Sequence, residues 1–159
     1  MKNRDFHSLW EFLVFVDTLS IRTLVADVQG RSIVSQSLKV AVRDRIGDAD
    51  RLPPPLAEST VQERVAKGFT PDDTLLRTGE LKRSIGWAHE GQTVSIVGSR
   101  DPKAMYHELG TAHIPRRSFL AATADEKNQE MFEKYLAAFV ASFVSGTSTT
   151  IAMSEAEAL

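Results

Sequence analysis

Two histidines and a glutamate in the second half of the chain are the residues that come nearest to a catalytic motif. His107 and Glu108 are adjacent, and His113 lies six residues after His107. A zincin-type hydrolase needs two histidines four residues apart on one helix face, with the glutamate between them. Here Gly110 also separates the histidines and should end the helix. We interpret them as ordinary polar residues near a chain turn, and a small metal-dependent hydrolase stays a remote alternative.

Other catalytic patterns are missing from the sequence. It has no Gly-x-Ser-x-Gly elbow and no glycine-rich phosphate loop. It has no cysteine, which removes disulfides, Cys-ligated zinc, iron–sulfur clusters and thiol nucleophiles. The adjacent carboxylates Asp125 and Glu126 fit a helix-dipole role better than acid–base catalysis. We expect no catalytic residue, no metal, no cofactor and no enzymatic activity.

The best basic patch is the pair Arg116 and Arg117, which follows a proline. Guanidinium groups there could bind phosphate or a carboxylate of another subunit. The net charge is −2 for the whole chain, +3 for residues 77–117 (seven basic, four acidic) and −4 for residues 118–159 (two basic, six acidic). Copies could therefore attract one another head to tail, although these charges also fit solvated faces. Because a duplex-DNA binder usually has a strongly basic face, we favour a protein contact.

An aromatic group near the N-terminus indicates burial on more than one side. Phe6, Trp10, Phe12 and Phe15 fall within one helical segment. Trp10 and Phe6 share one helix face, whereas Phe12 and Phe15 fall toward another. In a chain of 159 residues, this pattern fits burial against another subunit and fits an enclosed core helix equally well.

The composition is that of a soluble globular chain of about one domain. Hydrophobic residues make up 42% and charged residues 25%, close to the average. The apolar run 12–16 lies between Glu11 and Asp17, without the long uncharged core of a signal peptide. No stretch approaches the roughly 20 apolar residues that cross a bilayer. We expect no cleaved leader and no membrane contact.

Apolar periodicity predicts helices at both ends of the chain. Residues 5–46 should form two helices or one kinked helix, because Gly30 interrupts the pattern; a hairpin turning at Gln29-Gly30 is the competing prediction. After the prolines at 53–55 we expect a short helix to Lys67, capped by Ser59 or Thr60 and ended by Gly68. A further short helix should follow over 75–85, with Thr78 as a possible N-cap.

The middle of the chain should form a β-hairpin followed by two helices. Residues 84–89 and 93–97 flank a short glycine-containing turn. A short helix is expected over 102–109, and Ser118 or Thr123 could cap the last helix. We predict one domain over 1–144, with a helical part over 1–46, and a flexible or partner-ordered tail over 145–159. The fold class is α+β, a small antiparallel sheet packed against a long N-terminal helix (or helix pair) and a C-terminal helix.

Several segments of the chain resemble a known family. Leu76–Ile85 (LRTGELKRSI), Val97-Gly98 with Tyr106–Thr111 (YHELGT), and Ile114–Leu120 (IPRRSFL) are similar, in this order, to segments of phage tail-completion proteins. These are neck or minor tail components of the virion-morphogenesis family. The stretch 55–60 (PLAEST) is also similar to that family. The resemblance covers about residues 53–125, with Ser118 where the family commonly has proline.

The resemblance implies a virion protein that forms a ring in the neck of a long-tailed phage or phage-like particle. The ring would be a homo-oligomer, a hexamer, that completes the tail and joins it to the DNA-filled head; a tail-terminator or head-closure ring is the alternative. Implied partners are a head-side connector or head-closure protein and a tail-terminator or tail-tube protein. DNA would pass through the lumen without sequence-specific contact, and assembly would take place in the host cytoplasm. We expect Glu108, Arg116 and Arg117, together with Trp10, Phe12 and Phe15, at subunit or partner contacts.

Overall fold

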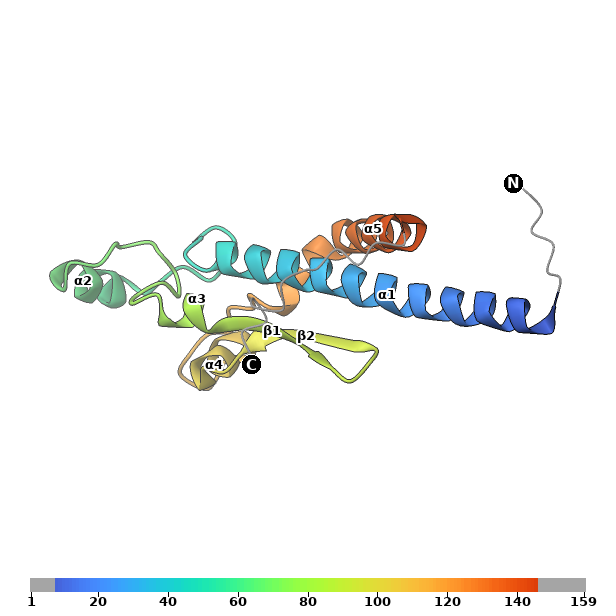
Figure 1. The fold of residues 1–159 in the computed structure, drawn as a ribbon. Helices are drawn as coiled ribbons and strands as arrows, with labels where there is room; N and C mark the ends of the chain where they lie inside the picture. Colours follow the sequence, from blue (N-terminus) through green and yellow to red (C-terminus); the bar gives the residue numbers. More distant parts are fainter. Residues whose placement is uncertain (1–7, 146–159) are drawn as a thin grey trace.

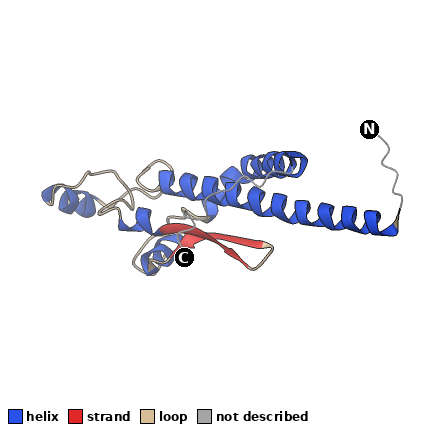
Figure 2. Cartoon of the chain, viewed as in Figure 1, coloured by secondary structure: helices blue, strands red, loops and turns tan. Residues whose placement is uncertain are grey.

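The computed structural model describes residues 8–145, and the fold over this range is α+β (Figure 1). A long N-terminal helix and a C-terminal helix pack together, with a two-stranded antiparallel hairpin between them in sequence (Figure 2). This confirms the predicted fold class. The predicted tail over 145–159 lies outside the described residues except for Ser145, which ends the last helix. The elements in chain order are α1 (Leu9–Arg45), α2 (Glu58–Ala66), α3 (Glu80–Ser84), β1 (Ile85–Glu90), β2 (Val94–Ser99), α4 (Pro102–Leu109) and α5 (Ala121–Ser145).

Helix α1 runs unbroken through the glycine that was expected to interrupt it. The Ser8 hydroxyl caps its start by accepting from the Glu11 N–H at 3.2 Å. The predicted break at 29–32 and the competing hairpin at Gln29-Gly30 are both wrong, because α5 packs over this site. A Cβ on Gly30 would lie 2.7 Å from the Tyr135 ring, so the glycine allows close approach of two helices at a small cost in helix propensity.

The hairpin packs on α1 with the face that carries Trp87 and His89. Across it, Trp87 donates to Gln36 at 2.9 Å, and the His89 ring nitrogens lie 3.0 Å from the Ser32 hydroxyl and 2.7 Å from the Ser95 hydroxyl. Because side chains alternate along a strand, Val94 and Ile96 point to the opposite face, where both are exposed. The predicted hairpin is confirmed, with the continuous register Ile85↔Ser99 to Glu90↔Val94 and a turn over 91–93.

Helices α2 and α3 begin differently from the prediction. The N-cap of α2 is Ala57, with no capping side-chain bond, so the capping box at Ser59 or Thr60 is wrong. Gly68 has φ +77° just after the helix end, as expected of a left-handed terminating residue. The N-cap of α3 is the left-handed Gly79 rather than Thr78, and the helix is limited to five residues.

The hydrophobic core lies where the C-terminal part of α1 meets the base of the hairpin, α4 and the start of α5. Its buried members come from α1, the loop after it, α3, β1, α4 and the turn just before α5: Val42, Ile46, Leu52, Leu81, Ile85, Ala104 and Phe119. The N-terminal part of α1 projects beyond both the hairpin and α5, and α2 lies at the opposite end of the molecule (Figure 1). Within residues 8–145, no helix combines the length and apolar character needed to cross a membrane.

Candidate functional site

The end of α4 carries the glutamate of the sequence motif. Asp101 caps the start of α4 by accepting from the Lys103 N–H at 2.9 Å, and Pro102 occupies its first turn. Gly110 ends the helix with φ +77°, and a Cβ there would lie 3.0 Å from the Arg116 backbone nitrogen. The chain therefore turns tightly and returns past Glu108.

The carboxylate of Glu108 serves as the N-terminal cap of α5. It accepts the backbone N–H groups of Phe119 and Leu120 at 2.9 Å and of Ala121 at 3.0 Å, together with the Ser118 hydroxyl. Burial alone would raise the pKa of Glu108, but the hydrogen bonds from Ser118 and the three N–H groups bring the pKa below its usual value. The carboxylate is thus held ionised at the positive end of the helix dipole.

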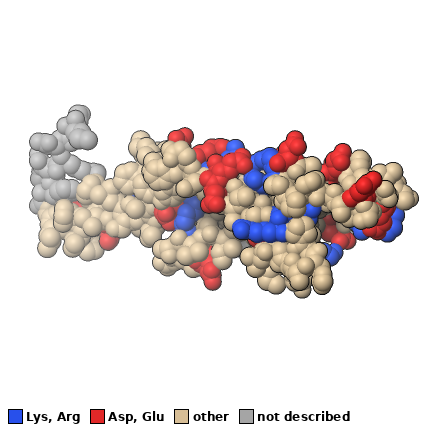
Figure 3. Space-filling view, turned by 180° about the vertical axis from the view of Figure 1, so that it is seen from behind, with Lys and Arg blue, Asp and Glu red and all other residues tan. Residues whose placement is uncertain are grey.

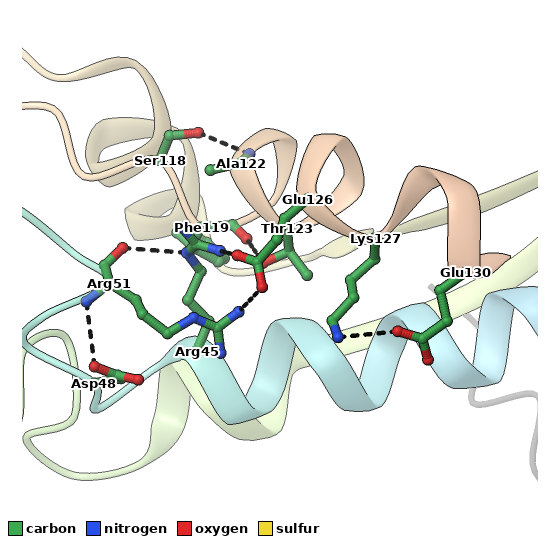
Figure 4. Close-up of polar contacts among 10 residues, drawn as sticks. All are labelled: Arg45, Asp48, Arg51, Ser118, Phe119, Ala122, Thr123, Glu126, Lys127 and Glu130. Atoms are coloured by element: carbon green, nitrogen blue, oxygen red, sulfur yellow. Dashed lines mark hydrogen bonds and ion pairs between the residues drawn. The ribbon is translucent and has the colours of Figure 1, made fainter.

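Ser118 also caps α5, which confirms the first of the two capping residues predicted from the sequence, Ser118 and Thr123. Its hydroxyl oxygen accepts from the Ala122 N–H at 3.3 Å (Figure 4). Thr123, the other predicted cap, lies inside the helix, where its hydroxyl donates to the Phe119 carbonyl. The start of α5 is therefore fixed by one residue from its own chain turn and one from α4.

The two arginines after Pro115 have different environments. Arg117 is buried, and it donates to the carbonyl oxygens of Pro54 at 3.0 Å and Pro55 at 3.2 Å. Burial lowers the pKa of its guanidinium. Arg116 is exposed and donates from Nε to the Glu108 carbonyl at 3.1 Å. Of the basic pair, Arg117 joins two segments of this chain, while Arg116 is the one at the surface.

The two histidines do not form a metal centre with neighbouring ligands. Across residues 8–145, no group of three His, Cys, Asp or Glu side chains is arranged to hold a metal ion. Burial lowers the pKa of His107, and Arg117 adds to this effect. The His107 Nδ1 is buried and has no hydrogen-bond partner among the described residues, whereas His113 is exposed. Partial burial of His107 at the base of the turn therefore favours its neutral form.

The predicted aromatic contact residues lie on the projecting part of α1. Trp10 is 74% exposed and Phe12 is 45% exposed, while Phe15 is partly buried. They do not approach the Glu108 turn, so the six predicted contact residues form two separate regions. One region is a turn with internal ties, and the other is an apolar helix surface.

Ion pairs and hydrogen bonds between distant segments are the features that the sequence analysis did not predict. Glu126 accepts from Arg45 and from Arg51, each at 2.8 Å, which joins α5 to the end of α1 and the loop after it (Figure 4). No acidic residue lies in the first turn of α5, so the helix-dipole interpretation of Asp125 and Glu126 is wrong. Tyr135 donates to Asp27 at 2.8 Å, which joins α5 to α1; the ion pair of Asp27 with Arg31, four residues later, is local to α1. No local pattern links Glu126 to Arg45 and Arg51, or Tyr135 to Asp27.

Comparison with family models, curated proteins and solved structures found no match for this chain. The geometry alone therefore describes the site. It provides internal hydrogen bonds around Glu108 and a broad exposed apolar surface on α1.

Proposed function

We propose that this protein is a structural virion component that forms a ring in the neck of a long-tailed phage or phage-like particle. The ring, a hexamer, completes the tail and joins it to the DNA-filled head. Its neighbours are a head-side connector or head-closure protein and a tail-terminator or tail-tube protein, and the ring is assembled in the host cytoplasm. A tail-terminator or head-closure ring is the alternative position in the same particle. The role is non-catalytic and needs no cofactor or membrane.

The observation that carries this proposal is the apolar surface along the N-terminal half of α1. Nine large apolar side chains between Leu9 and Val28 are 38% to 74% exposed. A large side chain has a full accessible area of about 150–250 Å², so the exposed fractions of these nine residues correspond to roughly 900 Å² of accessible apolar surface. A monomer's largest apolar patch is usually about 300–600 Å², so this surface favours a subunit that is completed by other chains.

The family-like segments support the proposal in a second way. Leu81 and Ile85 of the first segment and Phe119 of the third belong to one core cluster. Glu108 of the middle segment caps the helix that follows Phe119. The residues that resemble the family thus build one compact unit, and their pattern can be explained by folding rather than catalysis.

The first experiment is electron microscopy of particles made when only this gene is silenced in the genome that carries it. We expect separate DNA-filled heads and free tails, and restoration of joined particles when the wild-type gene is supplied. Normal infectious particles in its absence would contradict a neck role.

The second experiment is light scattering and negative-stain microscopy of the purified chain across a concentration series, alone and with isolated tails. A ring in either sample supports the proposal. A chain that stays monomeric in both would contradict it.

A further inference from the structure

The exposed apolar side chains of α1 include a stripe with heptad spacing. Trp10, Val14, Ile21, Leu24 and Val28 follow one another at steps of three, four or seven residues, so they share one helix face; we call this the α1 stripe. Asp17 occupies the one remaining position of the repeat. Figure 3 shows few charged atoms at this end of the molecule. All five apolar members are exposed, from 42% at Val28 to 74% at Trp10.

The α1 stripe continues a face that is already an interface within the chain. One turn after Val28, Ser32 contacts His89, and Gln36 contacts Trp87, so the hairpin covers this face of α1 from there onward. Arg31 holds the hairpin turn by donating to the Gln92 carbonyl. Beyond that turn the same face is uncovered within residues 8–145, and it remains apolar.

A second uncovered stripe lies on α5. Phe132, Leu136, Val140 and Val144 recur every four residues and are 43% to 74% exposed; we call this the α5 stripe. It faces away from the contact with α1, where Met131 and Ser142 are buried. No charged residue occurs between Tyr135 and Ser145. At 1.5 Å per residue the α5 stripe is about 18 Å long, and the part of the α1 stripe from Trp10 to Leu24 is about 21 Å long.

We propose that the α1 stripe of one copy packs lengthwise against the α5 stripe of the adjacent copy. The occupant of the α1 surface is thus a second copy of this chain, and the proposal rests on the ring described above. The five apolar residues of the α1 stripe present about 500 Å² of exposed surface, and the four of the α5 stripe present about 400 Å². Together these areas match the apolar share, about 57%, of a standard interface that buries about 1,600 Å² from both partners. This contact would bury both stripes at once.

Two features favour α5 over a second α1 as the occupant. A parallel pair of α1 helices would place Asp17 opposite the Asp17 of its partner, where like charges repel. A symmetric α1 pair would also stop at two copies and leave the α5 stripe exposed. A contact between two different surfaces can instead repeat around a closed ring.

The absence of cysteine makes cross-linking a direct test. We would prepare full-length single-cysteine chains carrying Ile21→Cys, Leu136→Cys or, as the control on α2, the exposed Val65→Cys. Because each chain has one thiol, every link made by a short bis-maleimide joins two copies. Chains of different size tags distinguish mixed from identical pairs.

We expect the mixture of Ile21→Cys and Leu136→Cys to give the mixed pair as its main product, at least fivefold above any pair that contains Val65→Cys. Leu24→Asp added to the Ile21→Cys chain should reduce that product at least fivefold while the helix signal in circular dichroism is unchanged.

Three results overturn the proposal. Links between two Ile21→Cys chains that exceed the mixed product would assign the surface to a symmetric α1 pair. Rings that form without the mixed link would overturn this contact and leave the proposed function standing. Absence of any assembly, with or without isolated tails, would overturn the ring and this contact together.

Discussion

The carboxylate of Glu108, in the last turn of α4, accepts the backbone N–H of Leu120 at 2.9 Å, which ties the end of one helix to the start of another. Three neighbouring donors bind the same carboxylate, so Glu108, together with the Ser118 hydroxyl that accepts from Ala122, fixes where α5 begins. Helix α5 in turn packs along α1, so Glu108 also controls how the two long helices meet.

Removing the Glu108 cap should destabilise the folded chain. We expect Glu108→Ala to lower the free energy of unfolding by about 2 kcal/mol, because capping carboxylates and charge-assisted hydrogen bonds contribute on that order. The measurement is urea unfolding followed by circular dichroism. Glu90→Ala, at an exposed strand end, is the matched control and should change stability by under about 0.5 kcal/mol. Equal effects of the two variants would contradict the capping role.

The same carboxylate should make stability depend on acid pH. Hydrogen bonds from Ser118 and the backbone outweigh burial and hold the pKa of Glu108 below its usual value. Its ionised form therefore stabilises the fold above the unfolded carboxyl pKa of about 4.3. That contribution is lost as the pH falls from there through the folded pKa. The stability difference between wild type and Glu108→Gln should shrink over this range. A difference that stays constant from pH 7 to pH 2.5 would contradict the assignment.

The contact between Gly30 and Tyr135 should reverse the usual effect of a glycine-to-alanine change. In an open helix, Gly→Ala stabilises by up to about 1 kcal/mol. Here the added Cβ would lie 2.7 Å from the Tyr135 ring, so we expect Gly30→Ala to destabilise by about 1–3 kcal/mol. In a Tyr135→Ala background the same change should be neutral or stabilising. A double-mutant cycle by urea unfolding measures this, and additive effects would refute the steric explanation.

The neighbouring arginines should separate into a folding role and a surface role. Arg117 binds the carbonyl oxygens of Pro54 and Pro55 from a buried position. We expect Arg117→Ala to cost about 2–3 kcal/mol, because two hydrogen bonds from a buried charged donor are lost. Arg116→Ala, one residue away and exposed, should cost less than about 1 kcal/mol. Thermal or urea unfolding of both variants compares them directly.

A charge reversal tests the proposed subunit contact at the surface arginine. We expect Arg116→Glu to reduce ring formation in light scattering at least severalfold while the chain stays folded, since complementary charges at an interface contribute to association. Arg22→Glu, at an exposed position of α1 off the α1 stripe, is a charge-matched control. Ring formation untouched by Arg116→Glu would remove Arg116 from the contact.

Local patterns were enough to predict much of the fold. The hairpin, α4 with Gly110 at its end, and the long α5 follow from strand alternation, a left-handed glycine and helical periodicity, all of which depend on residues close in sequence. The prediction failed at Gly30, because its effect depends on Tyr135, a residue of another helix. It also failed at the start of α2, where good capping residues exist but the helix begins before them.

The candidate site shows the same division. The sequence by itself determined that Glu108 lies at a helix end, that the arginine pair follows it, and that Trp10 and Phe12 belong to a helix that is apolar on more than one face. Only the tertiary structure decided that Glu108 and Arg117 bind groups of their own chain, and that the apolar faces of α1 and α5 stay exposed. The physical reason is that periodicity specifies which side chains share a face, whereas burial depends on which segment the chain's long-range packing brings against that face.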